Sequence, residues 1–162
     1  MSLFQNVVII AILIIAAGFL SLTEIALAGA RKVKLKILAE SGDERAQKVL
    51  DLQHQSADFF AASQIGLNAV AILGGILGEA AFRPFFVHLV DRFYDGPWTE
   101  TIGFVLSFTF VTSLFILFAD LMPKRLAMIA PEKIAVSVIN PIQVFIKICK
   151  PLAWFILSLI HI

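Results

Sequence analysis

Three long apolar stretches constrain this chain more than any other feature of its sequence. They cover approximately residues 4–29, 59–82 and 101–123. A helix of about twenty residues rises about 30 Å, which matches the hydrocarbon core of a bilayer. We therefore predict an all-α membrane protein with three transmembrane helices and amphipathic juxtamembrane helices.

The composition favours a membrane protein and excludes some other classes. Hydrophobic residues make up 59% of the 162 residues, charged residues make up 15%, and the mean hydropathy is +0.91. A soluble domain of this length normally carries more charge. Because the net charge is only +1, we expect membrane lipid rather than nucleic acid as a partner.

Polar residues and prolines interrupt the apolar pattern between and after the spans. Residues 31–57 are predicted to form cytoplasmic helices with a break near Ser41-Gly42, and the segment after residue 82 is predicted to form a loop. Proline interrupts the hydrogen bonding of a helix. Residues 130–160 are therefore predicted to be a juxtamembrane belt of short helices, because prolines recur there at positions 131, 141 and 151.

Basic residues predict the orientation of the chain in the membrane. Lysine and arginine are enriched on the cytoplasmic side of transmembrane helices. They follow the first and third spans, whereas the segment between the second and third spans is mixed in charge. The N-terminus is therefore expected outside and the C-terminus in the cytoplasm. The basic residues are Arg31, Lys32, Lys34, Lys36, Lys124, Arg125 and Lys133.

Two carboxylates within the spans are the strongest candidates for a functional role. A carboxylate in the hydrocarbon core costs about 2.5–3.5 kcal/mol on insertion scales, and such residues are often functional. Glu24 precedes Arg31 by seven residues, and Asp120 precedes Lys124 by four. Both acids are thus expected in the cytoplasmic half of the membrane, where they could hold one cation between two helices.

Neutral oxygen donors accompany both acids. Ser21 lies three residues before Glu24 and shares its helix face. Pro123 cannot donate a hydrogen bond to the carbonyl of Ala119, so that oxygen is available as a cation ligand beside Asp120. The missing hydrogen bond also predicts a kink at Pro123. Oxygen-only sites suit Mg²⁺, Ca²⁺ or Na⁺ better than zinc or copper. The predicted ligands are Ser21, Glu24, Ser63, Asn68, Ala119 and Asp120.

Simpler interpretations exist for these features. Glu24 and Asp120 could each form an ion pair with a basic residue at the membrane boundary, such as Arg31. Glu79 is expected to be structural, near the outer interface. Gly74 and Gly78 form a small-xxx-small pair, which is typical either of packing within one subunit or of a dimer interface.

Three short motifs resemble those of the CorC/CNNM family of membrane proteins. The residues are Phe19-Leu20-Ser21-Leu22-Thr23-Glu24-Ile25-Ala26-Leu27, Gln64-Ile65-Gly66-Leu67-Asn68 and Ala119-Asp120-Leu121-Met122-Pro123-Lys124-Arg125. The third departs from the family's usual Gly-Glu, because Ala119-Asp120 stands there. Aspartate is one methylene shorter than glutamate, which favours a wider or more hydrated cavity that would also accept an organic diamine.

The resemblance carries further expectations about assembly and activity. It implies a homodimer formed through the transmembrane helices, a cytoplasm-facing acidic cavity that binds Mg²⁺, and a location in the bacterial inner membrane. It also implies cytoplasmic CBS and transporter-associated domains that follow in the full-length chain.

Three functions remain open from the sequence. The leading one is efflux of Mg²⁺, driven by a sodium gradient as the resemblance implies. The second is export of polyamine or diamine cations through the same acids, and the third is a Mg²⁺-sensing membrane regulator without transport. No nucleophile–base pair, metal-hydrolase pattern or phosphate loop is evident in the sequence, so we do not expect an enzyme.

Overall fold

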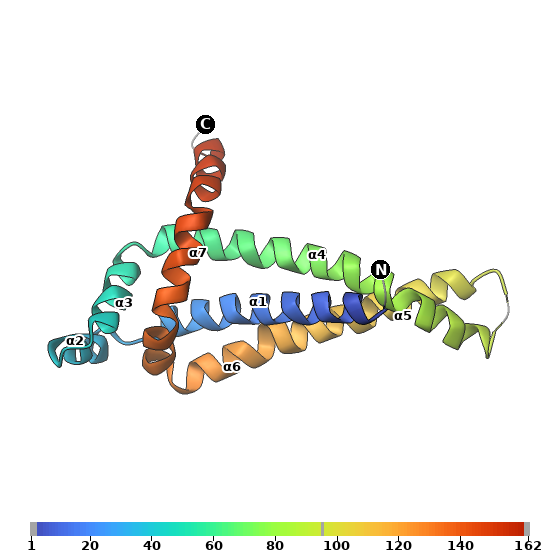
Figure 1. Ribbon diagram of the computed structural model, residues 1–162, viewed down its shortest axis with the longest axis horizontal. Coiled ribbons are helices and arrows are strands. Elements are labelled where there is room, and N and C mark those ends of the chain that lie inside the picture. Colours follow the sequence, from blue (N-terminus) through green and yellow to red (C-terminus); the bar gives the residue numbers. More distant parts are fainter. Residues whose placement is uncertain (1–2, 95, 161–162) are drawn as a thin grey trace. The chain divides into compact units, whose positions relative to one another are not determined.

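The computed structural model describes residues 3–94 and 96–160, which fold into helices without a β-strand in those ranges (Figure 1). This confirms the predicted all-α class. The chain runs in the order α1 (Leu3–Gly29), α2 (Lys32–Glu40), α3 (Glu44–His54), α4 (Ser56–Asp91), α5 (Thr99–Leu114), the π-helix η1 (Phe115–Leu121), α6 (Met122–Ile129) and α7 (Pro131–Ile160).

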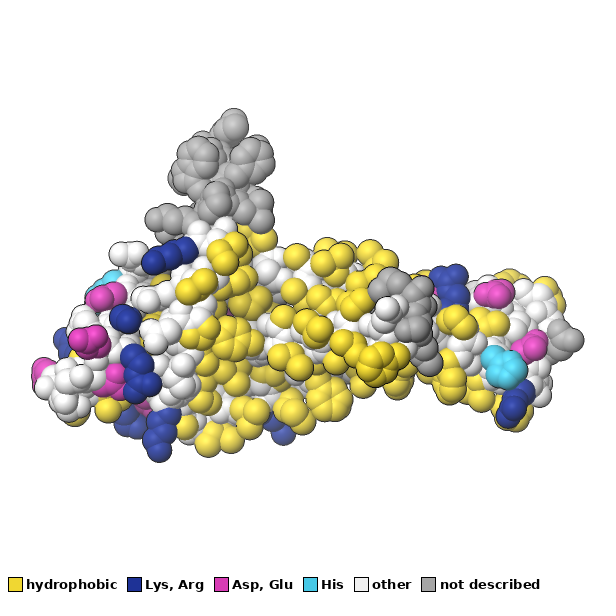
Figure 2. Space-filling model, in the orientation of Figure 1, with side chains coloured by type: hydrophobic (Ala, Val, Ile, Leu, Met, Phe, Trp, Pro, Cys, Tyr) yellow, Lys and Arg dark blue, Asp and Glu magenta, His cyan; other side chains and the backbone are white. Residues whose placement is uncertain are grey.

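Three helical segments are long and apolar enough to cross a membrane. They are Phe4–Gly29, Phe59–Asp91 and Thr99–Ile129. Hydrophobic side chains cover much of the visible surface of α1 and α4, whereas lysine and arginine gather over α2 and α3 (Figure 2). The protein is therefore a membrane protein with three candidate spans, as the hydropathy pattern predicted.

The predicted effects of the prolines were largely wrong. Helix α4 continues through Pro84 to Asp91 where a loop was expected. On either side of Pro84, Phe82 and Phe86 pack against the ring of Phe110 at centroid distances of 5.2 and 5.6 Å. Proline in a helix interior costs about 3 kcal/mol or more, and these contacts with α5 offset that cost.

Helix α7 is also one continuous helix rather than a belt of short ones. It begins with Pro131, a position that proline favours because the first amide of a helix needs no partner. Pro141 lies on its exposed side, while Ile139 and Ile142 on the other side are buried. The buried apolar face therefore keeps the helix intact despite the missing hydrogen bond.

The third helical segment likewise does not end at Pro123. Helix α6 includes this proline and extends to Ile129. The helical geometry changes just before it, because Phe115–Leu121 adopts a π-helix. In a π-helix the hydrogen bonds join residues five apart, and such segments often occur at functional sites.

The chain divides into two compact units, which we describe separately. The first comprises Met1–Gly18 and Asn68–Met122, and the second comprises Phe19–Leu67 and Pro123–Ile162. The first unit holds a helical hairpin of α4 and α5 with η1. The second holds α2, α3, α6 and α7 with the adjoining parts of α1 and α4.

Glycines bring the two helices of the hairpin in the first unit close together. A Cβ atom on Gly74 would overlap the ring of Phe115, and one on Gly78 would overlap Val111. Both glycines are buried. Of the two predicted roles for this small-xxx-small pair, packing within one subunit is the one that these contacts support.

Glu79 lies buried in the same hairpin. Its Oε1 accepts hydrogen bonds from Nε of Arg83 at 2.5 Å and from Oγ of Ser107 at 3.4 Å. The Arg83 guanidinium also lies over the Phe104 ring, 5.2 Å from its centroid. An ion pair with an additional hydrogen bond and a cation–π contact satisfies the buried charge, which agrees with the structural role predicted for Glu79.

An apolar core joins the helices of the second unit. Its largest fully buried side chains are Phe59, Leu35, Ile139 and Ile142. Gly66 of α4 lies against Leu20 of α1 and Phe145 of α7, where an added Cβ would stand 2.9 Å from each. This close approach needs the absence of a side chain, and it brings α1, α4 and α7 together in one core.

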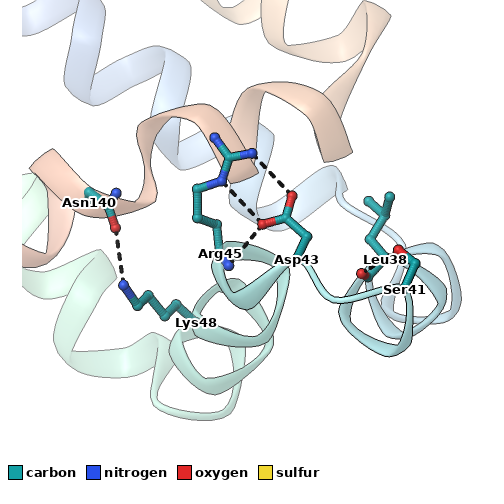
Figure 3. A network of polar contacts seen from close by, with 6 residues as sticks. All are labelled: Leu38, Ser41, Asp43, Arg45, Lys48 and Asn140. Atoms are coloured by element: carbon teal, nitrogen blue, oxygen red, sulfur yellow. Dashed lines mark hydrogen bonds and ion pairs between the residues drawn. The ribbon is translucent and has the colours of Figure 1, made fainter.

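Polar contacts connect α2, α3 and α7 around this core (Figure 3). The chain turns between α2 and α3 at Gly42, whose φ of +99° suits glycine, close to the break predicted near Ser41-Gly42. Asp43 then caps α3 by accepting from the backbone N–H of Arg45. Lys48 of α3 donates to the side-chain oxygen of Asn140 in α7 at 3.4 Å.

Ion pairs also link α2 to α7. Nε of Arg31 lies 3.1 Å from Oε1 of Glu132, and Nζ of Lys34 lies 3.5 Å from the same oxygen. The hydrogen bond from Arg31 is the main reason that the pKa of Glu132 lies below its ordinary value. The contacts therefore favour the ionised carboxylate in the folded protein.

This shift predicts a pH dependence of stability. An acid with a lowered pKa in the folded state stabilises the fold above its unfolded pKa of about 4.3, and this contribution is lost as the pH falls through the folded value. We expect Glu132→Gln to lower the unfolding temperature in detergent at pH 7, and the difference from wild type to shrink as the pH falls from the unfolded pKa through the lower folded pKa. A difference that stays constant between pH 7 and pH 3 would contradict this.

Candidate cation-binding site

The second unit brings Glu24 together with the side-chain amide of Gln64. Nε2 of Gln64 in α4 donates to Oε1 of Glu24 in α1 at 3.4 Å, a long hydrogen bond. Glu24 is half-buried and Gln64 is exposed. The close approach of α4 to α1 at Gly66 and Leu20 positions the pair, because Gln64 lies two residues before that glycine.

Two buried serines lie on the same helices as this pair. Ser21 precedes Glu24 by one helical turn, and Ser63 is adjacent to Gln64; neither serine has any exposed surface. In the described part of the chain, Oγ of Ser63 has no hydrogen-bond partner. A buried hydroxyl without a partner is costly and unusual, so it is a reasonable ligand for a polar guest.

The first unit contains the other predicted ligands. Asn68 of α4 is exposed, Ala119 is buried, and Asp120 is half-buried. Ala119 and Asp120 both belong to the π-helix η1, within which the chain changes its hydrogen-bond pattern. The N–H of Met122 donates to the carbonyl of Leu117, five residues before it.

Proline accounts for this local geometry. Pro123 has no N–H for the carbonyl of Ala119, and its ring would clash with that carbonyl in a regular α-helix. Widening the preceding turn to a π-helix relieves such a clash. The irregular backbone before Pro123 is thus a π-helix that contains Asp120. The span was predicted to end at Pro123, but the helix continues through it.

The predicted site residues lie in both units. Ser21, Glu24 and Ser63 belong to the second unit, and Asn68, Ala119 and Asp120 belong to the first. The structure places Glu24 beside Gln64 within the second unit. The convergence of Glu24 and Asp120 on one cation, and the ligand set as a whole, stay predictions.

The ion-pair interpretation receives no support for Glu24 and Arg31. Arg31 pairs instead with Glu132 of α7. Sequence reasoning also left Gln64 out of the predicted ligands, although it lies in an apolar span and in the second motif. Its position as a polar residue between Ser63 and Asn68, within an apolar span, could have identified it as a candidate ligand.

The polar groups near Glu24 are of kinds that bind a hydrated or organic cation as well as a metal ion. Within the described ranges, no three side chains of His, Cys, Asp or Glu gather closely enough to hold a metal ion. On α1 and α4, the second unit offers the carboxylate of Glu24, the amide of Gln64 and the hydroxyls of Ser21 and Ser63. Carboxylate, amide and hydroxyl oxygens all accept hydrogen bonds from N–H donors.

Comparison with known proteins shows the family. Residues 8–161 match the CNNM family, described as the cyclin M transmembrane N-terminal domain. This chain belongs to that family. The three motifs that resembled CorC/CNNM proteins therefore predicted its membership correctly.

Two of the bacterial relatives of this CNNM domain carry names that refer to export. The chain is 49% identical over 98% of its length to the polyamine export protein of Escherichia coli K12, and 43% identical over 96% to that of Haemophilus influenzae. It is 31% identical over 90% to a UPF0053 protein of Synechocystis. The chain spans about a third of the length of these relatives, at 35%, 36% and 33% respectively.

Proposed function

We propose that this chain is the membrane domain of an exporter of polyamine-type organic cations. The observation that carries the proposal is 49% identity, over 98% of the chain, to a protein named polyamine export protein. This relationship favours the second of the functions left open by the sequence over efflux of Mg²⁺. The first prediction, Mg²⁺, becomes the competing outcome of the test below.

The chemistry around Glu24 supports an organic cation. Alkyl amines have pKa values near 10, like the lysine side chain, so they are ammonium ions at pH 7. Each ammonium group carries three donors and binds a carboxylate through charge-assisted hydrogen bonds. The Glu24 carboxylate, the Gln64 side-chain oxygen and the Ser63 hydroxyl would supply acceptors of that kind.

The same set suits Mg²⁺ less well. Mg²⁺ requires near-octahedral oxygen ligands at about 2.0–2.1 Å and dehydrates reluctantly. An amine accepts longer and less regular contacts, and its alkyl chain fits the apolar walls of the spans. We also propose that the cation enters from the side of α2 and α3, because the basic residues there mark the cytoplasmic side.

A titration of the purified domain tests this function. The chain in lipid nanodiscs would be titrated with spermidine, Mg²⁺ and Na⁺ in separate calorimetric experiments. We expect saturable binding of spermidine that 1,3-diaminopropane weakens by competition and that equimolar Mg²⁺ leaves nearly unchanged. Saturable binding of Mg²⁺ with none of spermidine would overturn the proposal in favour of a magnesium protein.

A further inference from the structure

A groove in the second unit lies between α2 and the junction of α6 with α7. Its volume is about 380 Å³, and its apolar lining comes from both sides: Ile37 and Leu38 from α2, and Ile129 and Ala130 from the junction. Lys34, Glu132 and Lys133 complete the lining. The groove therefore has an apolar floor and a charged rim.

The apolar surface continues outward from this groove. Ile129 is 79% exposed, and Ile37 is 60% exposed. Val33, one helical turn before Ile37 on α2, is 71% exposed. Contiguous exposed apolar side chains on a helix with basic neighbours are typical of a helix that lies in the membrane interface.

The groove lies at the end of a candidate span. Ile129 is the last residue of the segment Thr99–Ile129; Ala130 follows directly and Lys133 lies one helical turn later. Helix α2 begins three residues after the first candidate span ends at Gly29. Both sides of the groove therefore come from residues that leave the hydrocarbon core, where phospholipid headgroups lie.

Positive charge dominates the rim. Lys34 and Lys133 line the groove together with a single carboxylate, that of Glu132, which is already paired with Arg31. Lys34 uses at most one of its three N–H donors for Glu132, since its Nζ lies 3.5 Å from Oε1 of that residue. The remaining donors of Lys34 and Lys133 are suited to a phosphate.

We propose that this groove binds an anionic phospholipid. The phosphate of the headgroup lies between Lys34 and Lys133, and an acyl chain lies along Ile37 and Ile129. Charge complementarity and the position at the end of the span both favour a lipid of the cytoplasmic leaflet as the occupant. The site holds a lipid in place as a ligand, separately from the cation that Glu24 is proposed to bind.

Native mass spectrometry of the purified chain in detergent tests the proposal. Phosphatidylglycerol and phosphatidylcholine with identical acyl chains would be added at equal concentration, with glycerol phosphate as a headgroup-only probe. We expect retained phosphatidylglycerol, little phosphatidylcholine and no effect of glycerol phosphate. Lys34→Gln/Lys133→Gln should weaken phosphatidylglycerol binding on the order of twenty-fold, since each basic residue at an anionic surface contributes about fivefold.

The matched control is Lys32→Gln/Lys36→Gln, which removes the same charge from α2 outside the groove. We expect this control to lose less than fivefold. Equal losses in the two double variants would mean a diffuse surface charge and would overturn the proposed site, as would equal retention of phosphatidylcholine. The variant Ile129→Asp gives a further test. If it converts a dimer into a monomer and leaves phosphatidylglycerol binding unchanged, a second copy of the chain occupies the groove and the proposed lipid site is overturned.

Discussion

Glu24→Gln is expected to weaken binding of spermidine by about tenfold to a hundredfold. The substitution keeps the shape of the side chain and its contact with Gln64 but removes the negative charge. A hydrogen bond to a charged group contributes about 1.5–3 kcal/mol, which corresponds to this range of affinity. Calorimetric titration of the chain in nanodiscs measures the effect directly.

A second measurement separates binding from folding. A carboxylate within a span costs about 2.5–3.5 kcal/mol on insertion scales, so Glu24→Gln should leave the unfolding temperature unchanged or raise it. The control is Glu40→Gln, an exposed glutamate at the end of α2, for which neither affinity nor stability should change. Unaltered spermidine affinity in Glu24→Gln would remove Glu24 from the binding site.

A double-mutant cycle tests the predicted partnership between Glu24 and Asp120. If both carboxylates bind one substrate molecule, the effects of Glu24→Gln and Asp120→Asn on affinity should not add. Strict additivity would mean that the two acids act at independent sites, or that only one of them acts. The cycle thereby measures whether the two acids bind the same substrate molecule.

Gly74→Ala should destabilise the hairpin of α4 and α5. A methyl group at this position would overlap the ring of Phe115, which must move into already packed surroundings. Overpacking of this kind costs about 1–3 kcal/mol, although alanine gains about 1 kcal/mol over glycine from helix propensity. We expect a net loss of up to about 2 kcal/mol, visible as a lower unfolding temperature in detergent.

The neighbouring glycine supplies the control. A Cβ on Gly75 would meet no atom within 4 Å, so Gly75→Ala should be neutral or stabilising by up to about 1 kcal/mol. In the background of Phe115→Leu, Gly74→Ala should cost less than in wild type. Equal stability of Gly74→Ala and Gly75→Ala would show that the ring of Phe115 does not pack against α4 as described.

The spans and the family could be predicted from residues close together in the chain. Membrane insertion depends on apolar character summed over about twenty neighbouring residues, and that sum is read directly from the sequence. The three motifs are equally local, and they indicated the CNNM family correctly. Glu24 stood out for the same reason, because a carboxylate within an apolar stretch is conspicuous without knowledge of the fold.

The effect of the prolines could not be predicted in this way. Pro84 and Pro141 each remove one hydrogen bond, and whether the helix ends depends on what packs around them. Phe110 of α5 supports α4 beside Pro84, and buried isoleucines hold α7 around Pro141. These contacts come from distant parts of the chain, so local propensity gave the wrong answer.

Membrane insertion, the number of candidate spans and the polar residues within them thus follow from the sequence alone. The contacts between distant residues emerge only from the fold: Gln64 beside Glu24, Glu132 beside Arg31, and Phe115 over Gly74. The difference lies in the distance along the chain over which each effect acts. Hydropathy adds up along a helix, whereas a hydrogen bond, an ion pair or a packing contact requires two helix faces to meet.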